Sequence, residues 1–421
     1  MELHPSAVGA PGIDPLVIDQ LSARRDVSRP PPADPARSPT GRSRALRLPI
    51  VLVSLVLVLA ALFATGLALV VKARGDGPAG VVGSPPVASE PAAPGRKTLR
   101  ELAPPGVRIG SAADGRGLSL DPAYSSLLGT EFNAVTTENA MKWRNLEPLP
   151  GVYAWPGADQ LVEFAERHGQ QVYGHTLVWH SDMPKWVSPD WPAERIRTEL
   201  RDHVTEVVSR YRGRVWAWDV VNEVLDEDGS LRETLWLRKL GPGYIADAFR
   251  WAHAADPGAR LFINDYGIEG RTRKADALLA LVRDLRRDGV PVDGVGFQSH
   301  LAWDEPPREL TGNLRRFADV GVSVAITELD VRVELPVTPE KLKRQAAVYR
   351  QVLRSCLAVP ACVSFTVWGF TDSRSWIPGY HRGYGAACLF DADLTPKPAY
   401  QALVDELSRH AGTARAGPTP N

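Results

Sequence analysis

Short apolar segments alternate with amphipathic segments along most of residues 98–410, and this alternation constrains the fold most strongly. The apolar segments are predicted β-strands, and they comprise residues 108–112, 134–138, 171–179, 215–223, 259–266, 294–300, 323–330 and 362–369. The amphipathic segments have a helical period, and they comprise residues 158–168, 193–211, 244–255, 273–288, 308–320 and 339–357. Eight strands that are mostly separated by helices predict a closed parallel (β/α)8 barrel, a TIM barrel of the α/β class.

Polar side chains gather where seven of these eight predicted strands end. In a (β/α)8 barrel the catalytic residues come from the carboxyl ends of the strands. The residues concerned are Glu138, Asn139, His175, His180, Asn222, Glu223, Asn264, Asp265, Tyr266, Gln298, Ser299, His300, Glu328, Asp330 and Trp368. Scattered polar residues are normal at strand ends, but so regular a distribution favours a functional site at the barrel mouth.

Two of the strands carry a glutamate near their ends, in the segments WDVVNE (218–223) and AITELD (325–330). A carboxylate beside a buried strand is costly unless it has a partner or a function. One such glutamate is usually a helix cap or a solvated loop residue, but two of them favour an acid/base or acid/nucleophile pair. Asp330 lies two residues beyond Glu328 and therefore on the same side of the strand. Glycoside cleavage is a chemistry built on such a pair.

The segment before the predicted barrel has a different composition. Residues 1–47 are rich in Pro, Ala and Arg and are predicted to be disordered. Residues 48–71 contain no charged side chain and are long enough for one transmembrane helix. Residues 72–97 are rich in Gly, Pro and Ala and are interpreted as a linker to the catalytic barrel, 98–410. Residues 411–421 are predicted to form a flexible tail.

The arginines around residues 48–71 predict an orientation in the membrane. Five arginines lie within about 20 residues before this segment, whereas one lysine and one arginine follow it. The positive-inside rule therefore places residues 1–47 in the cytoplasm and the barrel outside the cell, as a single-pass membrane protein. A cleaved signal peptide, and hence a secreted protein, is the alternative.

Charge and cysteine content limit the possible partners. The 49 basic and 49 acidic side chains balance, which argues against a nucleic-acid partner. Cys356 and Cys362 are close enough to close a small loop, so an exported domain would have a disulfide there, while a cytoplasmic one would keep two buried thiols. Cys388 is then a free thiol. His175 and His180 could suggest metal ligands, but no further His or Cys cluster completes a site, so we expect no metal and no cofactor.

Seven segments, spread over the whole predicted barrel, resemble glycoside hydrolase family 10, the endo-1,4-β-xylanases. They are FNAVTTENAMKW (132–143), GHTLVWHS (174–181), WDVVNEVL (218–225), NDY (264–266), GVGFQSHL (294–301), ITELDV (326–331) and VWGFTDSRSWIP (367–378). Their order and spacing are those of the family. The resemblance implies a retaining hydrolase that cleaves internal β-1,4-xylosidic bonds of xylan by double displacement. Asp182 and Gly267 depart from the family, which often has Gln and Asn at these places.

The resemblance also implies roles for individual residues. Glu223 matches the acid/base, which must hold a proton at the start, and Glu328 matches the ionised nucleophile. His300 and Asp330 match the residues that support the nucleophile, and Asn222 matches the amide that contacts the sugar 2-hydroxyl. The residues that match substrate-binding positions are Glu138, Asn139, Lys142, His175, Trp179, Tyr266, Gln298, Trp368 and Trp376.

Other functions remain compatible with the same residues. A broader β-1,4-glycanase that also cuts cellulosic or mixed glucans would use the same carboxylate pair. A noncatalytic surface module would only hold polysaccharide, although the presence of both glutamates argues against it. The expected partners are xylan or xylo-oligosaccharides and, through residues 48–71, a membrane, with a monomer as the expected oligomeric state.

Overall fold

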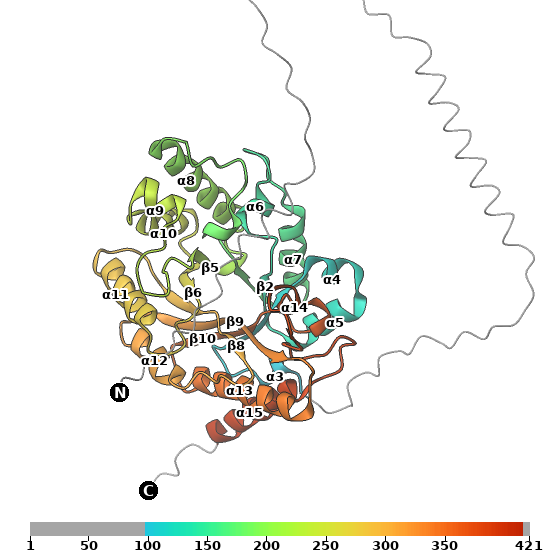
Figure 1. Cartoon of the computed structure of the whole chain (residues 1–421). Helices are drawn as coiled ribbons and strands as arrows, with labels where there is room; N and C mark the ends of the chain where they lie inside the picture. The colour runs from blue at the N-terminus through green and yellow to red at the C-terminus, as the bar shows by residue number, and fades with distance from the viewer. Residues whose placement is uncertain (1–96, 416–421) are drawn as a thin grey trace, which may run out of the picture. The chain divides into compact units, whose positions relative to one another are not determined.

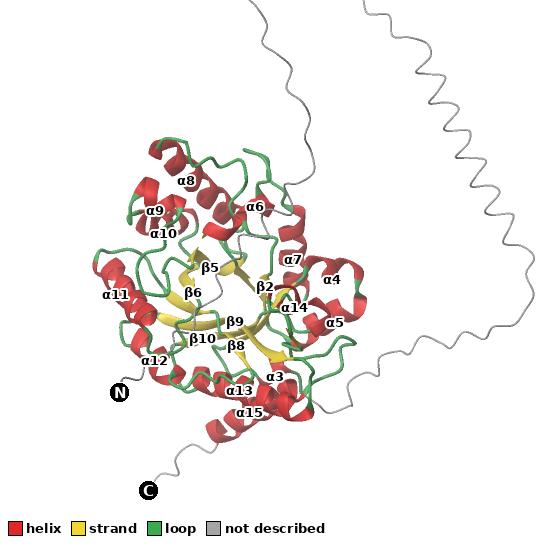
Figure 2. Ribbon diagram, in the orientation of Figure 1, coloured by secondary structure: helices red, strands yellow, loops and turns green. Residues whose placement is uncertain are grey.

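The computed structural model describes residues 97–415, and within them eight parallel strands close into a barrel surrounded by helices (Figure 1, Figure 2). The barrel strands are β1 (Arg108–Ala113), β2 (Ala134–Thr137), β3 (Gln171–Gly174), β5 (Val215–Asn222), β6 (Arg260–Asp265), β7 (Gly294–Phe297), β9 (Ser323–Glu334) and β10 (Cys362–Val367). They pair in this order, and β10 pairs with β1 to complete the ring. The predicted (β/α)8 barrel is therefore confirmed.

The strands are buried on both faces, as a parallel barrel requires. β5, for example, has seven of its eight residues buried. A small cluster of Tyr173, Ala217, Phe262 and Ala325 is separate from the main hydrophobic core, and its residues come from the neighbouring strands β3, β5 and β6 and from β9. The main core joins the strands to the surrounding helices. This packing fixes the strand ends, and hence the side chains at the barrel mouth.

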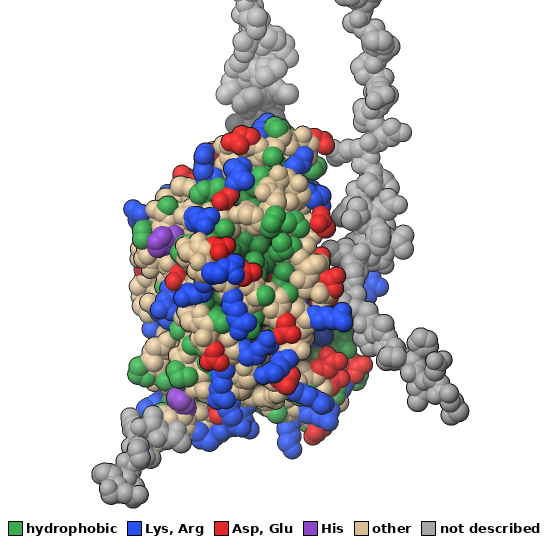
Figure 3. All heavy atoms as spheres, turned by 90° about the vertical axis from the view of Figure 1, so that its left-hand side faces the viewer, with side chains coloured by type: hydrophobic (Ala, Val, Ile, Leu, Met, Phe, Trp, Pro, Cys, Tyr) green, Lys and Arg blue, Asp and Glu red, His purple; other side chains and the backbone are tan. Residues whose placement is uncertain are grey.

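The helices bury one apolar stripe each and turn charged residues outward. Those that follow barrel strands include α7 (Pro156–Arg167), α8 (Ala193–Arg210), α10 (Tyr244–Ala255), α11 (Arg273–Arg287), α12 (Leu310–Ala318) and α13 (Pro339–Leu357). Threonine caps begin two of them: the Thr272 hydroxyl accepts from Ala275 N–H in α11, and the Thr338 hydroxyl accepts from Lys341 N–H in α13. Basic and acidic side chains lie among one another on the face shown in Figure 3.

Several elements differ from the prediction. The segment predicted as one strand over 171–179 is divided, because the chain leaves the ladder after β3 and pairs again only at β4 (Val178–Trp179). The segment 294–300 is divided in the same way into β7 and β8 (His300–Ala302), with Ser299 at a φ of 64° between them. A left-handed residue cannot continue a strand, so the side chains after it take new directions.

The sequence pattern did not reveal the helices that follow β1, or the last helix. They are α4 (Gly115–Leu120), α5 (Pro122–Glu131) and α15 (Pro398–Arg415), and further short helices are α3 (Leu99–Leu102), α6 (Trp143–Leu146), α9 (Leu235–Leu240) and α14 (Ile377–Tyr380). α4 contains two glycines, which weaken a helical signal. The flexible tail was predicted to begin at residue 411, but α15 continues to Arg415.

Cys356 and Cys362 form a disulfide that links the end of α13 to the start of β10, and Cys388 is a buried free thiol. The predicted disulfide is thus present. Within residues 97–415 no helix has the length and apolar character needed to cross a membrane. The predicted membrane segment, 48–71, lies outside the described residues, as do the segments predicted to be disordered and, except for Lys97, the linker.

Candidate active site

Glu223 follows the last residue of β5 and has a backbone φ of 58°. This left-handed conformation is uncommon for a residue other than glycine and costs on the order of 1–3 kcal/mol. Two hydrogen bonds hold it: Glu223 N–H donates to the Asn264 carbonyl at 2.9 Å, and the Glu223 carbonyl accepts from Arg232 Nε at 3.0 Å. The strand therefore stops here, and the carboxyl group lies half-buried at the mouth.

Glu328 lies within β9 and is 4% exposed. Its Oε1 accepts from Asn264 Nδ2 at 2.6 Å, and its Oε2 lies 3.2 Å from His300 Nε2. Burial raises the pKa of this carboxyl, but the electrostatic effect of His175 and the hydrogen bond and charge of His300 outweigh burial. The net pKa of Glu328 is therefore lowered from its ordinary value. The carboxylate is ionised near neutral pH.

Amide side chains connect the two carboxyl groups. Gln298 Nε2 donates to Glu223 Oε1 at 3.1 Å and lies 3.3 Å from Asn222 Oδ1. Asn264 Nδ2 donates both to Asn222 Oδ1, at 2.9 Å, and to Glu328. A Cβ atom on Gly296 would lie 2.2 Å from Asn264 Oδ1, so only glycine leaves room for this bridge.

His300 joins Glu328 to Asp330 on the other side. His300 Nδ1 lies 3.0 Å from Asp330 Oδ2, which also accepts from Trp376 Nε1 at 2.7 Å. Burial lowers the pKa of an imidazole, but Asp330 and Glu328 together raise the pKa of His300 to about 10. The ring therefore carries both protons at neutral pH and donates to both carboxylates. These contacts bring together the residues predicted to support the nucleophile.

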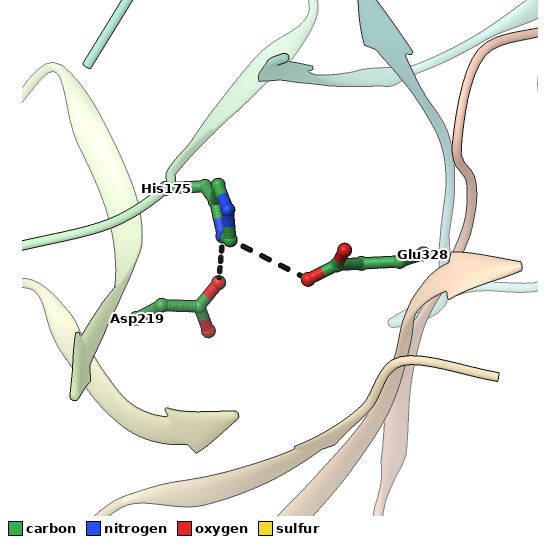
Figure 4. Close-up of side chains that lie close together, drawn as sticks. All are labelled: His175, Asp219 and Glu328. Atoms are coloured by element: carbon green, nitrogen blue, oxygen red, sulfur yellow. Dashed lines mark hydrogen bonds and ion pairs between the residues drawn. The ribbon is translucent and has the colours of Figure 1, made fainter. Parts of the chain in front are cut away.

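His175 lies between Asp219 and Glu328 (Figure 4). His175 Nδ1 is 2.9 Å from Asp219 Oδ2 and 3.8 Å from Glu328 Oε1, and the candidate ligand atoms of all three residues lie within 4.8 Å of one another. Both Asp219 oxygens already accept hydrogen bonds, because Tyr173 donates its hydroxyl to Oδ1 at 2.7 Å. Burial raises the pKa of Asp219, although its hydrogen bonds offset part of this effect. The cluster is therefore explained as a hydrogen-bond network that orients His175 rather than as a metal site.

The predicted sugar-binding residues after β2 lie together beside the mouth. Lys142 Nζ donates to Asn139 Oδ1 at 2.9 Å and lies 5.0 Å from the ring centroid of Trp179. Asp182 lies 3.8 Å from the same ammonium group, so this departure from the family pattern contributes an anchor for Lys142. Glu138 is half-buried, and burial, together with the charge of Asp114, raises its pKa.

Three aromatic residues contact the imidazoles of the site. Trp368 packs edge-on against His175, with ring centroids 5.1 Å apart, and Trp376 packs against His300 at 5.0 Å. Trp179 lies 6.1 Å from His175. Trp143 and Trp218 are instead buried in the core. The tryptophans of the mouth provide apolar walls around the carboxylate pair.

Tyr266 is linked to Glu223 through Arg232, which donates to both residues. Its hydroxyl accepts from Arg232 Nη2 at 3.2 Å, and the Lys274 ammonium group lies 3.4 Å from its ring centroid. Lys274 is fully buried and lies 3.0 Å from Asp265 Oδ1. Burial raises the pKa of Asp265 to about 7, against the effect of Lys274. Tyr266 is thus fixed by two cations, one at its hydroxyl and one at its face.

The structure gives contacts within the site to three residues for which no role was predicted. Asn264, Asp219 and Arg232 each contact a residue of the predicted set directly. Asp219 had a signal in the sequence, since a charged residue interrupts the apolar run of β5. Asn264 was noted as a polar strand end without a role. Arg232 lies in a loop and had no signal.

Comparisons with known proteins agree with this geometry. The family model described as glycosyl hydrolase family 10 matches residues 98–406. An endo-1,4-β-xylanase of Agaricus bisporus is 45% identical over 304 residues, which are 72% of this chain and 91% of the relative. Endo-1,4-β-xylanase B of Thermotoga neapolitana is 43% identical over 70% of this chain and 87% of its own.

Solved structures show the same likeness. Native xylanase 10B from Thermotoga maritima aligns with a TM-score of 0.73 and 42% identity, and the alignment covers 75% of this chain and 99% of that chain. Xylanase 10B from Thermotoga petrophila, solved in complex with xylobiose, aligns with a TM-score of 0.72 and 42% identity over 74% and 97% of the two chains. The family match and these identities over most of the barrel establish that the chain belongs to glycosyl hydrolase family 10.

Proposed function

We propose that the barrel is a retaining endo-1,4-β-xylanase that hydrolyses internal β-1,4-xylosidic bonds of xylan. The observation that carries this proposal is the pair Glu223 and Glu328 at the mouth of a family 10 barrel, connected through the side chains of Gln298, Asn222 and Asn264. Two of the relatives described above are named as endo-1,4-β-xylanases, and xylanase 10B from Thermotoga petrophila was solved with xylobiose.

In the first step, Glu328 Oε attacks the anomeric carbon and the bond to the leaving sugar breaks. The lowered pKa of Glu328 supports its role as the ionised nucleophile. Glu223 gives its proton to the leaving oxygen, so the departing sugar leaves as a neutral alcohol. The protonated His300 holds Glu328 in place at Oε2, while Asn264 binds Oε1. The product is a covalent ester between Glu328 and the remaining sugar chain.

In the second step, Glu223 acts as a base. It takes a proton from water, the resulting hydroxide attacks the anomeric carbon, and the bond to Glu328 breaks. Glu223 regains its proton and Glu328 its charge, so the enzyme returns to its starting state. Asn222 is the proposed contact for the 2-hydroxyl group, a hydrogen bond that strengthens in the transition state.

The remaining predicted residues are proposed to bind the polysaccharide. Glu138, Asn139 and Lys142 hold the sugar on the non-reducing side. Tyr266 provides a flat surface for the leaving sugar. The sugar at the cleavage site is enclosed by the side chains of His175, Trp179, Gln298, Trp368 and Trp376.

A substrate panel tests the proposed function. The domain from about residue 98 onward should release reducing sugars from xylan and much less from carboxymethylcellulose, because a pocket built for xylose has no room for a hydroxymethyl group. Comparable rates on both polymers would favour the broader β-1,4-glycanase. Binding of polysaccharide without any bond cleavage would favour the noncatalytic module.

We expect the first products to keep the β configuration, because each of the two displacements inverts the anomeric carbon once. A retaining pair needs its carboxyl groups about 5–5.5 Å apart, whereas an inverting pair leaves room for water at about 6.5–9.5 Å. Proton NMR of xylo-oligosaccharide hydrolysis, recorded before mutarotation, should show the β anomer first. Initial release of the α anomer would contradict double displacement.

The proposed location is the outer face of a cell membrane, with residues 48–71 as the anchor. This proposal rests on the length of the uncharged segment and on the arginines before it. The full chain should appear in the membrane fraction with its original N-terminus, and protease added to intact cells should remove the barrel. A mature N-terminus beyond about residue 66, located by sequencing, would instead indicate a secreted protein with a cleaved signal peptide.

A further inference from the structure

A hollow of about 310 Å³ lies between α8 and α10, in the ring of helices outside the barrel (Figure 1). Its lining comes from the second half of α8, from the turn after α8 and from the last turns of α10. These segments lead into the starts of β5 and β6, whereas Glu223 follows the end of β5. The eight residues of β5, at about 3.3 Å each, span roughly 25 Å. The hollow therefore lies toward the end of the barrel opposite the active site.

α8 gives the hollow its polar side. Arg201, Thr205 and Ser209 are spaced by four residues, so they form one row along this helix. Arg212 continues the row from the turn after α8, where its backbone N–H donates to the Ser209 carbonyl at 3.3 Å. The four side chains are exposed, and each can donate a hydrogen bond to an oxygen atom of a ligand.

α10 gives the hollow its apolar side. Trp251 is half-buried there, and Ala254 and Ala255 follow it on the same face with side chains too small to fill the space beside the indole. All twelve tryptophans lie within residues 97–415, and Trp251 is the one whose ring has neither an aromatic partner nor a cation over it. The exposed part of this ring is therefore free to contact a ligand.

The charges of the lining favour an anionic group. Two arginines line the hollow and no carboxylate does. Arg201 is paired with Asp202 at 2.8 Å, but Arg212 has no carboxylate within ion-pair distance in the part of the chain that the structure describes. A guanidinium group binds a carboxylate through two parallel hydrogen bonds. Arg212 is thus a cation that can take a carboxylate from a ligand.

A sugar that carries a carboxylate has features that match this lining. In a pyranose whose substituents are equatorial, the axial C–H bonds form a flat apolar surface. The face of an aromatic ring carries negative potential, which attracts such hydrogens. A uronosyl unit combines this surface with a carboxylate and several hydroxyls. Trp251 fits the first feature, Arg212 the second, and the hydroxyls of Thr205 and Ser209 the third.

We propose that this hollow is a second polysaccharide-binding site, which takes a uronosyl side group of acidic xylan. The inference rests on the proposed function and adds a substrate preference to it. A site away from the cleaved bond holds a long chain beside the enzyme and raises the effective concentration of its bonds at the active site. A short neutral oligosaccharide has no uronosyl group and gains nothing from the hollow.

Binding without cleavage is the first measurement. The domain from about residue 98 onward, which contains the closed barrel, carries Glu328→Gln so that the polymer stays intact. Isothermal titration gives Kd for glucuronoxylan and for the same polymer after its carboxylates have been reduced to alcohols. Arg212→Gln and Trp251→Ala should each raise Kd for glucuronoxylan by about threefold or more, as expected for a partly exposed contact. On the reduced polymer Arg212→Gln should have no effect.

Three further variants separate the contact with the sugar from packing and from net charge. Trp251→Phe keeps a flat ring and should retain most of the binding. Ala254→Phe fills the hollow from α10 and should weaken binding as Trp251→Ala does. Arg283→Gln is the matched control for Arg212→Gln, because it removes an exposed arginine of α11 that does not line the hollow. It should bind both polymers like the parent domain.

Activity with Glu328 restored is the second measurement. The same substitutions should leave kcat/KM on linear xylohexaose within about twofold of the wild type, because the cleavage site is intact. On glucuronoxylan, Arg212→Gln and Trp251→Ala should lower kcat/KM by about threefold, in line with the loss of binding.

Three results would overturn the inference and leave the proposed function intact. An unchanged Kd for glucuronoxylan in Arg212→Gln and Trp251→Ala would mean that the hollow holds no part of the polymer. An equal loss of Arg212→Gln on the reduced polymer would mean that a neutral chain occupies it. Binding of the domain to phosphatidylglycerol vesicles, lost in Arg212→Gln while Kd for glucuronoxylan is unchanged, would assign this surface to a membrane. No hydrolysis of xylohexaose by the wild type would instead refute the proposed function, and the binding measurements would still show whether the hollow takes an acidic polysaccharide.

Discussion

Replacing Glu328 by alanine should abolish measurable hydrolysis of xylan. The proposed reaction has no covalent intermediate without this carboxylate, so the loss should exceed about 10⁴-fold, the upper end of a typical acid/base effect. The fold should survive. Asn264 and His300 each lose one acceptor, and an unsatisfied buried donor costs about 1–3 kcal/mol, less than the stability of about 5–15 kcal/mol that is usual for a protein.

Two controls separate chemistry from packing in this experiment. Glu328→Gln keeps the shape and one acceptor oxygen, and it should be as inactive as Glu328→Ala. Glu334→Ala removes a glutamate from the same strand, β9, but an exposed one whose partner is Lys341. It should retain nearly full activity. Circular dichroism and thermal unfolding should show folded protein for all three, and near-normal turnover by purified Glu328→Ala would rule out its assignment as nucleophile.

The sequence predicted the barrel well because each strand carries its own signal. β5 was predicted over 215–223 and spans Val215–Asn222, since its β-branched run is buried on both faces. The same runs place their final polar residues at the mouth, so the two carboxylates could be predicted as a pair before any contact was known. The family resemblance, not the strand pattern, implied that His300 is the partner of Glu328. α13 was predicted over its full length from its helical period, and the structure shows that the Thr338 side chain caps its start.

Other parts of the site depend on contacts that a local pattern does not contain. The bridge through Asn264 requires β6 and β9 to approach each other across β7, and Gly296 to leave space for the amide. Arg232 reaches Glu223 from a loop, so only the folded chain reveals the contact. α4 lies beside the end of β1, and a short helix with two glycines gives little sequence signal.

Glu223→Ala should affect substrates differently according to their leaving group. Xylan leaves as an alcohol that needs a proton, so its hydrolysis should fall by about 10²–10⁴-fold, the usual contribution of a positioned acid. An aryl xylobioside with a good leaving group needs no such proton, so formation of its covalent intermediate should stay fast. Loss of the base then slows the second step, and a burst of aryl alcohol followed by slow turnover is the expected time course.

Added azide provides the decisive measurement for Glu223. A small anion needs no base, and it can enter the space left by the carboxyl group and attack the intermediate from the face that water uses. The turnover of the aryl substrate should rise, and the product should be a β-xylobiosyl azide.

The Glu223→Ala variant should still fold. Gln298 Nε2 loses Glu223 Oε1 as an acceptor but keeps a second acceptor, Asn222 Oδ1, at 3.3 Å. Glu227→Ala is the control, since this half-exposed carboxylate lies four residues further along the chain and contacts Lys274 at 3.3 Å. Equal losses of Glu223→Ala on both substrates, without a burst and without rescue by azide, would mean that Glu223 is not the acid/base.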